Sequence, residues 1–338
     1  MPDQPDYSAL GGDGHVGAID LGGTKIFGAV FAPDGRIVGR STVLIGRDHT
    51  PTSVVDKMVD AVDAAARDAG VGRRDLRAVA SGAPSPVELG SGIVVHAPNL
   101  GWHRFPLRDE LGRRLGVPVA VENDVRAAVL GENAAGAGRG VRNWVGVWPG
   151  TGIGGGIVLD GQLWRGSSNS AGEFGHMTIK AGGPRCGCGG RGHLEALASR
   201  TGIVNAIIRA VKRGQRTILS DWLGHDLAAA SGADLGRAWT AGDAVVSRVV
   251  DDAAGYLALG IASIANCVNP ELVVFGGGIV EGLGDRFLEL IARKLRGQEM
   301  VAATDPLRLV RCQLGDDAGL CGAALVARST IPSPAARR

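Results

Sequence analysis

A strand, a glycine-rich turn and a second strand follow one another twice in this chain of 338 residues. In the first copy Leu21-Gly22-Gly23-Thr24 joins strands predicted at 16–20 and 25–31. In the second, a glycine-rich run at 150–156 joins strands predicted at 143–148 and 157–159. Because glycine lets backbone N–H groups approach an anion closely, two such turns predict two α/β halves that hold a polyphosphate. The alternative interpretation is a pair of unrelated β-hairpins.

Turn residues and hydrophobic spacing divide the rest of the chain into strands and helices. Residues 1–15 are expected to form a flexible tail. We predict a smaller α/β lobe at 16–123, which the last helix (about 318–328) can rejoin, and a larger α/β lobe at 124–317. Further predicted strands are 37–43, 76–81, 93–96, 117–121, 272–275 and 307–313, and predicted helices are 51–70, 107–115, 124–135 and 283–296, with mostly helical chain at 193–268.

The charge balance and the cysteine content exclude several functional classes. Lysine and arginine exceed aspartate and glutamate by only 36 − 34 = 2, so no strong field favours nucleic acid or an anionic membrane. The five cysteines follow no secretory signal, which favours a reducing, cytoplasmic location. The uncharged run at 253–270 contains Tyr256, Asn266 and Asn269, and we interpret it as a buried helix rather than a membrane span.

The first glycine turn carries polar groups that suit a nucleotide. Asp20 ends the strand before the turn, and a carboxylate there can hold Mg²⁺ through water. Thr24 adds a hydroxyl donor to the N–H groups of Gly22 and Gly23. The motif precedes a strand, whereas a Walker A loop leads into a helix. Gly150-Thr151-Gly152-Ile153-Gly154 repeats the pattern in the second half.

Glu122-Asn123-Asp124 lies at the predicted junction of a strand and a helix. A carboxylate at such a junction can be buried and still reach a substrate. Phosphoryl transfer to an alcohol needs a base beside the hydroxyl, and Asp124 is the candidate. The alternative is that Asp124 only caps the helix, which is a common role for aspartate.

Two cysteines and two histidines cluster in a glycine-rich loop. Cys186 and Cys188 are flanked by His176, ten residues before the first, and His193, five residues after the second. Thiolates with imidazoles suit tetrahedral Zn²⁺, and four protein ligands predict a closed, structural site. The alternative is a flexible loop with free thiols. Glu173 and Glu195 flank the loop, where carboxylates could bind sugar hydroxyls.

In combination these motifs resemble the ROK family of sugar kinases and repressors, and within it the bacterial glucokinases, over about residues 16–328. The resemblance rests on the order and spacing of five motifs, which are Asp20-Leu-Gly-Gly-Thr24, Glu122-Asn-Asp124, Gly150-Thr-Gly-Ile-Gly-Gly-Gly156, Glu173-Phe-Gly-His176 and Cys186-Gly-Cys-Gly-Gly-Arg-Gly-His-Leu-Glu195. It implies an actin-like, ribonuclease-H-like α/β fold of two lobes with an active site in the cleft. It also implies ATP-dependent phosphorylation of a hexose at the 6-hydroxyl, with glucose converted to glucose 6-phosphate.

The resemblance assigns roles to individual residues of this chain. Asp124 would be the general base, and 81–86 would be a loop on the sugar side. The hexose would contact Asn99, Asn123, Asp124, Glu173, His176 and Glu195. ATP and Mg²⁺ would be held by Asp20, Gly22, Gly23, Thr24, Lys25, Thr151, Gly152 and Gly154, with Gly276, Gly277 and Gly278 near the nucleoside. Structural Zn²⁺ would be held by His176, Cys186, Cys188 and His193.

Two positions depart from the family pattern. His193 stands where the family most often has cysteine, and histidine is still a zinc ligand. Trp148-Pro149 precedes the second glycine turn, where smaller residues are usual.

Other activities remain open at this point. One is a kinase for another hexose or an N-acylmannosamine, or a glucokinase that uses polyphosphate. Another is a sugar-responsive repressor, although only 19 residues precede Asp20, too few for a helix-turn-helix domain. Relatives are commonly dimers or tetramers, so a homo-oligomer is expected.

Overall fold

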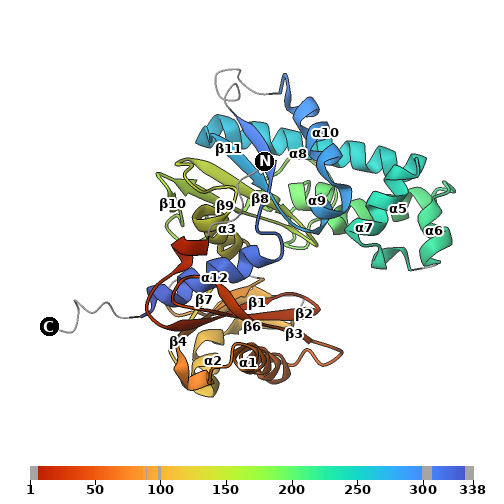
Figure 1. Ribbon diagram of the computed structural model, residues 1–338. Coiled ribbons are helices and arrows are strands. Elements are labelled where there is room, and N and C mark those ends of the chain that lie inside the picture. Colours follow the sequence, from red (N-terminus) through yellow and green to blue (C-terminus); the bar gives the residue numbers. More distant parts are fainter. Residues whose placement is uncertain are drawn as a thin grey trace. The chain divides into compact units, whose positions relative to one another are not determined.

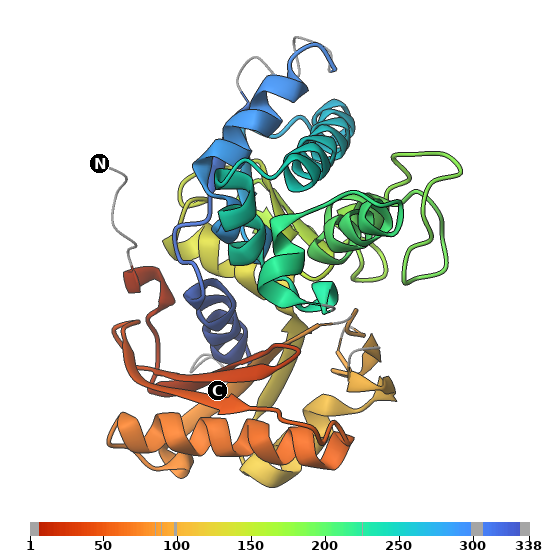
Figure 2. The ribbon, with the colours of Figure 1, turned by 90° about the vertical axis from the view of Figure 1, so that its right-hand side faces the viewer.

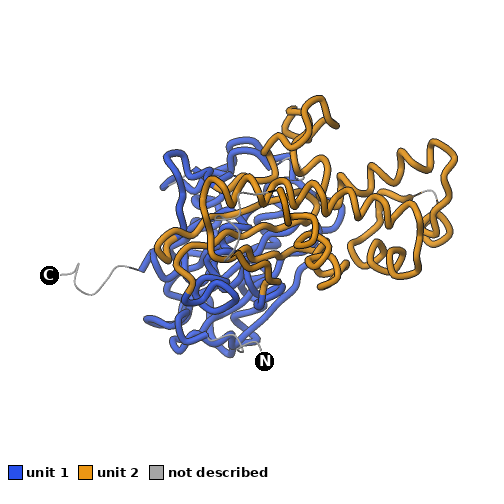
Figure 3. The backbone as a smooth tube through the Cα atoms, turned by 90° about the horizontal axis from the view of Figure 1, so that it is seen from above, with its two compact units in different colours: residues 1–140, 163–171, 313–338 blue, residues 141–162, 172–312 orange. Residues whose placement is uncertain are grey.

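The protein is described by a computed structural model that covers residues 7–84, 86–88, 90–97, 100–224, 226–298 and 307–331. The chain divides into two compact units (Figure 3). Unit 1 takes in the described residues up to Gly140, residues 163–171 and those from Gln313 onward, and unit 2 takes in 141–162 and 172–312. The chain therefore crosses between the units at 140/141, 162/163, 171/172 and 312/313.

Unit 1 is built on a five-stranded sheet in the order β3-β2-β1-β4-β7 (Figure 1). Strand β1 pairs antiparallel with β2 and parallel with β4, and β7 adds a further parallel strand beside β4. The bounds of these strands are β1 His15–Leu21, β2 Lys25–Phe31, β3 Ile37–Leu44, β4 Leu76–Ala83 and β7 Val119–Asn123. A two-stranded ladder of β5 (Val94–Ala97) and β6 (Trp102–Phe105) completes the strands described in this unit.

Helices cover both faces of this sheet (Figure 2). On one face, α1 (Pro51–Asp68) buries Val54, Val55, Met58 and Val62 at helical spacing, and α2 (Leu107–Leu115) lies beside it. On the other face, α12 (Asp317–Ser329) packs on β1 and β4 and against α3 (Asp124–Ala135). The N-terminal 3₁₀ helix η1 (Tyr7–Leu10) contacts α3 and α12.

Small residues allow α3 and α12 to approach backbone to backbone. A methyl group at Gly322 would lie 1.7 Å from the carbonyl oxygen of Ala127, and one at Gly131 would lie 2.3 Å from that of Ala318. Both distances are far below a van der Waals contact, so only glycine fits at these two positions.

The end of α3 is tied to the segment that precedes α12 by one buried carboxylate. Glu132 is fully buried. Its Oε2 accepts from the backbone N–H groups of Ala137 at 2.7 Å and Gln313 at 3.1 Å, and its Oε1 accepts from Leu314 at 2.8 Å. Burial raises the pKa of Glu132 even though these three bonds lower it. The Glu132 carboxylate thus ties to α3 two stretches of chain that lie next to crossings between the units, at residue 137 and at residues 313–314.

Unit 2 repeats the sheet topology of unit 1. Its order is β10-β9-β8-β11-β12, in which β8 pairs antiparallel with β9 and parallel with β11. The helices include the long α8, which Asp243 caps at its N-terminus and Asn269 ends in a left-handed conformation. The strands are β8 Trp144–Pro149, β9 Ile153–Leu159, β10 Gln162–Leu163, β11 Leu272–Phe275 and β12 Arg308–Arg311. The helices are η4 Phe174–His176, α4 Leu194–Ala198, α5 Arg200–Lys212, α6 Ile218–Leu223, η5 Leu227–Ala229, α7 Gly232–Thr240, α8 Ala244–Val268, α9 Gly278–Leu283 and α10 Asp285–Leu295.

Helix α8 occupies most of the uncharged run and buries Leu257, Ile261 and Ile264. Within the described ranges, no helix combines the length and the apolar character needed to cross a membrane.

The structure differs from the sequence prediction at several boundaries. Gly154, Gly155 and Gly156 belong to strand β9 instead of a turn, because they pair with Trp148, Val147 and Gly146 of β8. The helix expected at 283–296 is confirmed as α10, and an additional short helix, α9, precedes it and ends before Gly284, which has φ = +69°. Strand β7 extends two residues further than predicted, to Asn123.

The division of the chain also differs from the expected lobes. Helix α3 and residues 163–171 cluster with unit 1, whereas the sequence suggested a break between 123 and 124. Residues 7–15, expected in a tail, contain η1 and the fully buried Leu10. These residues are ordered because Arg328 of α12 donates to the carbonyl oxygens of Leu10 at 2.6 Å and Gly14 at 3.2 Å.

The α3–α12 contact predicts opposite effects for two glycine-to-alanine changes in helices. Gly322→Ala should lower the free energy of unfolding by about 1–3 kcal/mol, because the added methyl forces the helices apart. Gly112→Ala in α2 should raise it by up to about 1 kcal/mol, because nothing lies within 4 Å of the new methyl and alanine favours the helix. Urea unfolding monitored by circular dichroism measures both, and an unchanged Gly322→Ala stability would contradict the packing.

Candidate active site

The β1–β2 turn presents its polar groups to solvent. The N–H of Gly22 donates to the carbonyl oxygen of Lys25 at 3.0 Å, which closes the turn. Gly23, Thr24 and Lys25 are exposed, and a methyl group at Gly23 would meet nothing within 4 Å. The turn therefore leaves a hydroxyl, an ammonium group and open backbone exposed.

Asp20 lies at the end of β1, with its carboxylate between two glycines. A methyl at Gly319 of α12 would lie 3.2 Å from Asp20 Oδ2, and one at Gly82 of β4 would lie 3.7 Å from Oδ1. Burial raises the pKa of Asp20 to about 6, and Asp316 adds to the shift. Among the described residues no donor or cation is bonded to this carboxylate. Its ionised form thus gains from a bound cation, which fits the oxygen ligand that Mg²⁺ requires.

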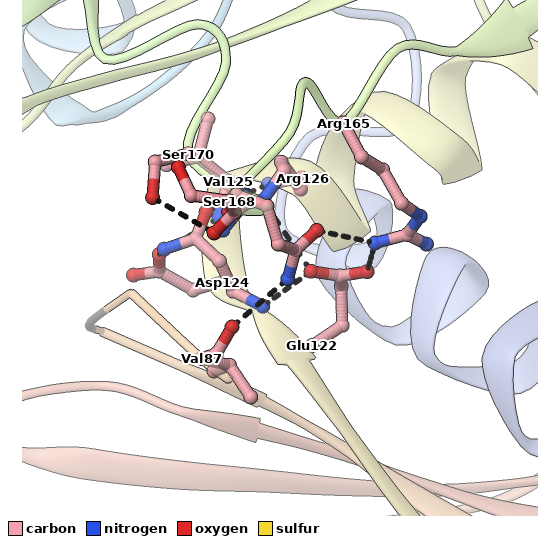
Figure 4. Close-up of polar contacts among 10 residues, drawn as sticks. Val87, Glu122, Asp124, Val125, Arg126, Arg165, Ser168 and Ser170 are labelled. Atoms are coloured by element: carbon pink, nitrogen blue, oxygen red, sulfur yellow. Dashed lines mark hydrogen bonds and ion pairs between the residues drawn. The ribbon is translucent and has the colours of Figure 1, made fainter. Parts of the chain in front are cut away.

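The β7–α3 junction orients Asp124 (Figure 4). Asn123 is the N-cap, because its side-chain oxygen accepts from Arg126 N at 3.0 Å. Its amide nitrogen then donates to Asp124 Oδ1 at 2.9 Å, and Val125 N donates to the same oxygen at 2.8 Å. Asn123 therefore performs the capping that the alternative interpretation gave to Asp124.

Gly82 brings the two acidic residues close together. A methyl group at Gly82 would lie 3.3 Å from the Cα of Asp124 and 3.7 Å from Oδ1 of Asp20. A candidate base and a candidate magnesium-binding carboxylate thus lie on either side of one glycine within unit 1.

A buried ionic network supports this junction and was not predicted from the sequence. Glu122, which is 4% exposed, forms an ion pair with Arg165 and lies 3.3 Å from the Nε of Arg126. Arg126 also donates to the carbonyl oxygen of Asn169. Arg165 and Asn169 follow the second hairpin in sequence, so local patterns give no signal that they reach β7.

In unit 2 the β8–β9 turn is held against the start of α5. Arg200 N donates to Gly150 O at 2.8 Å, and Thr201 Oγ1 donates to Thr151 O at 2.8 Å. The guanidinium of Arg200 donates to Thr151 Oγ1 at 3.4 Å. Thr151 is exposed. The turn keeps its hydroxyl and its backbone accessible, with a cation beside them that sequence reasoning did not identify.

Glu195 of α4 joins this turn to the Cys/His loop. Its Oε2 accepts from Ile153 N at 3.0 Å, and its Oε1 accepts from the thiol of Cys186 at 3.2 Å. A methyl group at Gly152 would lie 2.4 Å from Oε2. Glycine at 152 therefore makes room for the carboxylate.

The two cysteines and two histidines of the loop lie together. One ligand atom from each of the four side chains can be chosen so that all lie within 4.8 Å of one another. Cys186 Sγ is 3.8 Å from His176 Nδ1, and Cys188 Sγ is 3.2 Å from His193 Nδ1. Burial raises the pKa of the Cys186 thiol to about 12, and the neighbouring Glu195 carboxylate also raises it. Two sulfurs and two imidazole nitrogens fit a tetrahedral metal ion.

The third glycine motif explains why Trp148 fits in β8. A methyl group at Gly276 would lie 2.2 Å from the indole nitrogen of Trp148, so the indole occupies the space that glycine leaves. Gly277 has φ = +87°, and a methyl there would lie 2.9 Å from Pro149 O.

The predicted residues fall into separate groups. Unit 1 brings Asp20 and Asp124 together, and Asn99 lies outside the described residues. Unit 2 brings Glu195 into contact with both the glycine turn and the Cys/His loop, while Glu173 precedes η4. Gly154 lies inside β9 rather than in the turn.

Known proteins are similar over nearly the whole chain. The ROK family matches residues 16–330. A glucokinase from Halalkalibacterium halodurans is 36% identical over 306 residues, which cover 90% of this chain and 92% of the relative. A xylose repressor from Caldicellulosiruptor bescii is 28% identical over 311 residues, covering 91% of this chain and 77% of the repressor.

Solved structures have the same fold. The crystal structure of a ROK family glucokinase from Streptomyces griseus, in complex with glucose and AMPPNP, is similar with a TM-score of 0.80 at 34% identity, covering 94% of this chain and 100% of that one. The ROK hexokinase from Thermus thermophilus gives a TM-score of 0.76, also at 34% identity, over 93% of this chain and 97% of that one. The α/β, actin-like ATPase fold implied by the sequence motifs is confirmed.

The raised pKa of Asp20 predicts that Asp20→Asn stabilises the protein at neutral pH. The pKa of Asp20 in the folded protein, about 6, lies above the ordinary value of 3.8. The contribution of Asp20 to the free energy of unfolding is therefore fully present below about pH 4 and is lost as the pH rises through 6. The variant escapes this loss, which amounts to about 3 kcal/mol for a shift of about two pKa units. Urea unfolding from pH 4 to 7.5 should show an advantage of the variant that grows with pH.

Asp34 provides the control with the opposite sign. Hydrogen bonds from the backbone and side chain of Arg36 lower the pKa of Asp34, so Asp34→Asn should lose its small stability deficit as the pH falls. An advantage of Asp20→Asn that stays constant across this range would contradict the burial of the Asp20 carboxylate without a compensating charge.

Proposed function

The chain belongs to the ROK family, and we propose that it transfers the γ-phosphoryl group of ATP to the 6-hydroxyl of a hexose, with glucose as the preferred acceptor. The observation that carries this proposal is the pair of carboxylates beside Gly82: Asp124 is oriented by two donors, and Asp20 favours a cation. Relatives named glucokinase, and a relative crystallised with glucose and AMPPNP, support the same reaction.

On the acceptor side, Asp124 is the general base. It takes the proton from the sugar 6-hydroxyl while that oxygen forms a bond to the γ-phosphorus, and the bond from the γ-phosphorus to the bridging oxygen breaks to release ADP. The bonds from Asn123 and Val125 hold one carboxylate oxygen of Asp124 in place, which reduces the reorganisation needed at the transition state. The remaining acceptor contacts are assigned to Asn99, Asn123, Glu173, His176 and Glu195.

On the donor side, the two glycine turns bind the phosphate chain. Thr24 and Thr151 supply exposed hydroxyls, and Lys25 supplies a positive charge. Gly23 and Gly152 are assigned to bind phosphate through their backbone N–H groups, whereas the Gly22 N–H closes its own turn and Gly154 lies in β9 beside the second turn. The nucleoside is assigned to Gly276, Gly277 and Gly278. Asp20 would hold Mg²⁺ through water, and the ion would neutralise charge on the phosphates.

We assign the Cys/His group to structural Zn²⁺, held by His176, Cys186, Cys188 and His193. Cys186 bonds to Glu195, which in turn bonds to the second glycine turn. Zn²⁺ binds the thiolate, which does not donate to Glu195, so the ion would order this carboxylate through its ligand His193, which directly precedes α4. The ion supplies folding energy and no chemical step.

Removal of the proposed base tests the reaction. Asp124→Asn should lower kcat by about 10²–10⁴-fold, because proton transfer to a positioned base contributes that much, while calorimetry should still detect glucose binding. Asp285→Asn is a matched control, since Asp285 is likewise the first residue of a helix. A coupled ADP-release assay measures kcat, and full activity of Asp124→Asn would refute the assigned role.

Removal of the thiols tests the metal. The wild-type protein should contain about one zinc per chain, because the described residues include one tetrahedral ligand set. Cys186→Ser with Cys188→Ser should lose both zinc and thermal stability. Cys267→Ser, at an exposed cysteine outside the loop, should retain both. Elemental analysis and calorimetric melting measure these quantities, and a metal-free wild-type protein of equal stability would reject zinc.

The identity of the acceptor is tested with a panel of sugars. Mannose and allose differ from glucose in the configuration at one carbon, N-acetylmannosamine differs at carbon 2, and fructose is a ketose. ATP is compared with polyphosphate as donor. If the protein phosphorylates only the amino sugar, that sugar replaces glucose as the proposed acceptor. Specific binding of operator DNA would support the repressor alternative instead.

A further inference from the structure

Residues 163–171 leave the unit that surrounds them in sequence. They follow Gln162 and precede Gly172, both of unit 2, yet they cluster with unit 1. We call this segment, Leu163-Trp-Arg-Gly-Ser-Ser-Asn-Ser-Ala171, the strap. Two of its side chains bond to unit 1: Arg165 bonds to Glu122 of the strand that precedes the candidate base, and Asn169 bonds to Val87 after β4.

The first contact is with the strand that ends at the candidate base. Arg165 Nη1 donates to Glu122 Oε2 and, at 3.1 Å, to Asn169 Oδ1 (Figure 4). The other oxygen of Glu122 accepts from Asn123 N at 2.9 Å. Since Asn123 donates to Asp124, a continuous chain of bonds runs from Arg165 through Glu122 and Asn123 to the carboxylate of Asp124.

The second contact is with the segment after β4. Asn169 is 3% exposed, and its Nδ2 donates to the carbonyl oxygen of Val87 at 2.9 Å. Val87 forms an antiparallel bridge with Val94, the first residue of β5. The Asn169 amide thus bonds to the start of the segment 86–97, by which we mean its described residues 86–88 and 90–97, and this segment adjoins the loop assigned to the sugar side.

The backbone of Asn169 is specialised for this position. It has φ = +57°, in the left-handed region that few residues other than glycine and asparagine adopt. In this conformation its carbonyl oxygen accepts from Arg126 of α3 while its side chain reaches Val87. One residue therefore bridges α3 and the segment 86–97.

We propose that Arg165 and Asn169 are positioning residues for the acceptor sugar, because the strap fixes the carboxylate of Asp124 and the segment 86–97 relative to each other. This inference rests on the proposed function, in which Asp124 is the base for the hexose, and on the assignment to the sugar side of residues 81–86, which the segment adjoins. Within the part of the chain that the structure describes, neither side chain bonds to the glycine turns that are assigned to the donor.

Substitutions can separate positioning from general stability. Arg165→Met removes the charge and both bonds. Arg165→Lys keeps a donor, and because the bonds of Arg165 to Glu122 and Asn169 come from one nitrogen, an ammonium group can replace it. Asn169→Gly accepts the positive φ and keeps the backbone carbonyl, so it deletes only the amide. Arg142→Met is the control, because Arg142 forms an exposed ion pair with Asp160 in unit 2.

The expected kinetic result is a selective effect on the acceptor. Arg165→Met and Asn169→Gly should raise KM for glucose by about tenfold or more and lower kcat, since displacing a reactive group by about 1 Å can cost about 10²-fold. KM for ATP should stay within about twofold, because no donor group moves. Arg165→Lys should recover most of the acceptor affinity, and Arg142→Met should match the wild type.

Hydrogen exchange followed by mass spectrometry tests positioning without relying on turnover. In Arg165→Met and Asn169→Gly, peptides from 86–97 and 119–130 should exchange faster, whereas peptides from α8 should not change. Unchanged exchange at 86–97 and 119–130 overturns the inference, whatever the kinetics show. Equal rises in KM for ATP and glucose, or a failure of lysine to rescue, also overturn it by indicating a merely structural role.

The same experiment separates this inference from the proposed function. If the wild-type protein phosphorylates no sugar, the proposed function fails, and faster exchange in the two named segments still supports a strap that orders them. If the wild-type protein is active and the variants keep its glucose KM, the strap does not position the acceptor.

Discussion

The backbone contact between α3 and α12 determines where the acidic groups of unit 1 can lie. Gly322 lets α12 approach Ala127 of α3, and three residues earlier Gly319 lets the same helix pass beside the carboxylate of Asp20. Helix α3 begins with Asp124. A single close packing of two helices thus sets both the first residue of α3 and the surroundings of the strand end that carries Asp20.

Three buried or partly buried carboxylates in this unit have three different surroundings. Glu122 is compensated by arginine, Glu132 by three backbone N–H groups, and Asp20 by neither. The cost of burying a carboxylate without a partner is the physical cause of the raised pKa of Asp20. A buried carboxylate that lowers the stability of the protein is expected where a cation binds, because proteins retain destabilising residues mainly at functional sites.

Local sequence patterns were sufficient to predict the strands and helices that are bounded by turns. The β-hairpins, the helices α1, α2 and α3 and the cluster of Cys186, Cys188 and two histidines follow from spacing within short segments. The strap could not be predicted, because Arg165 and Glu122 are 43 residues apart and nothing local indicates that they meet. The pairing of Gly154–Gly156 in β9 likewise depends on tertiary packing, which overrides the local preference of glycine for turns.

The family relationship and the geometry support one reaction, and its product is the most direct test. The purified protein should be incubated with glucose, ATP and Mg²⁺, and the products followed by phosphorus NMR. The account predicts one ADP for each phosphate ester formed, with the ester on the 6-oxygen of the sugar. Release of inorganic phosphate without a sugar ester, or an ester at another hydroxyl, would contradict it.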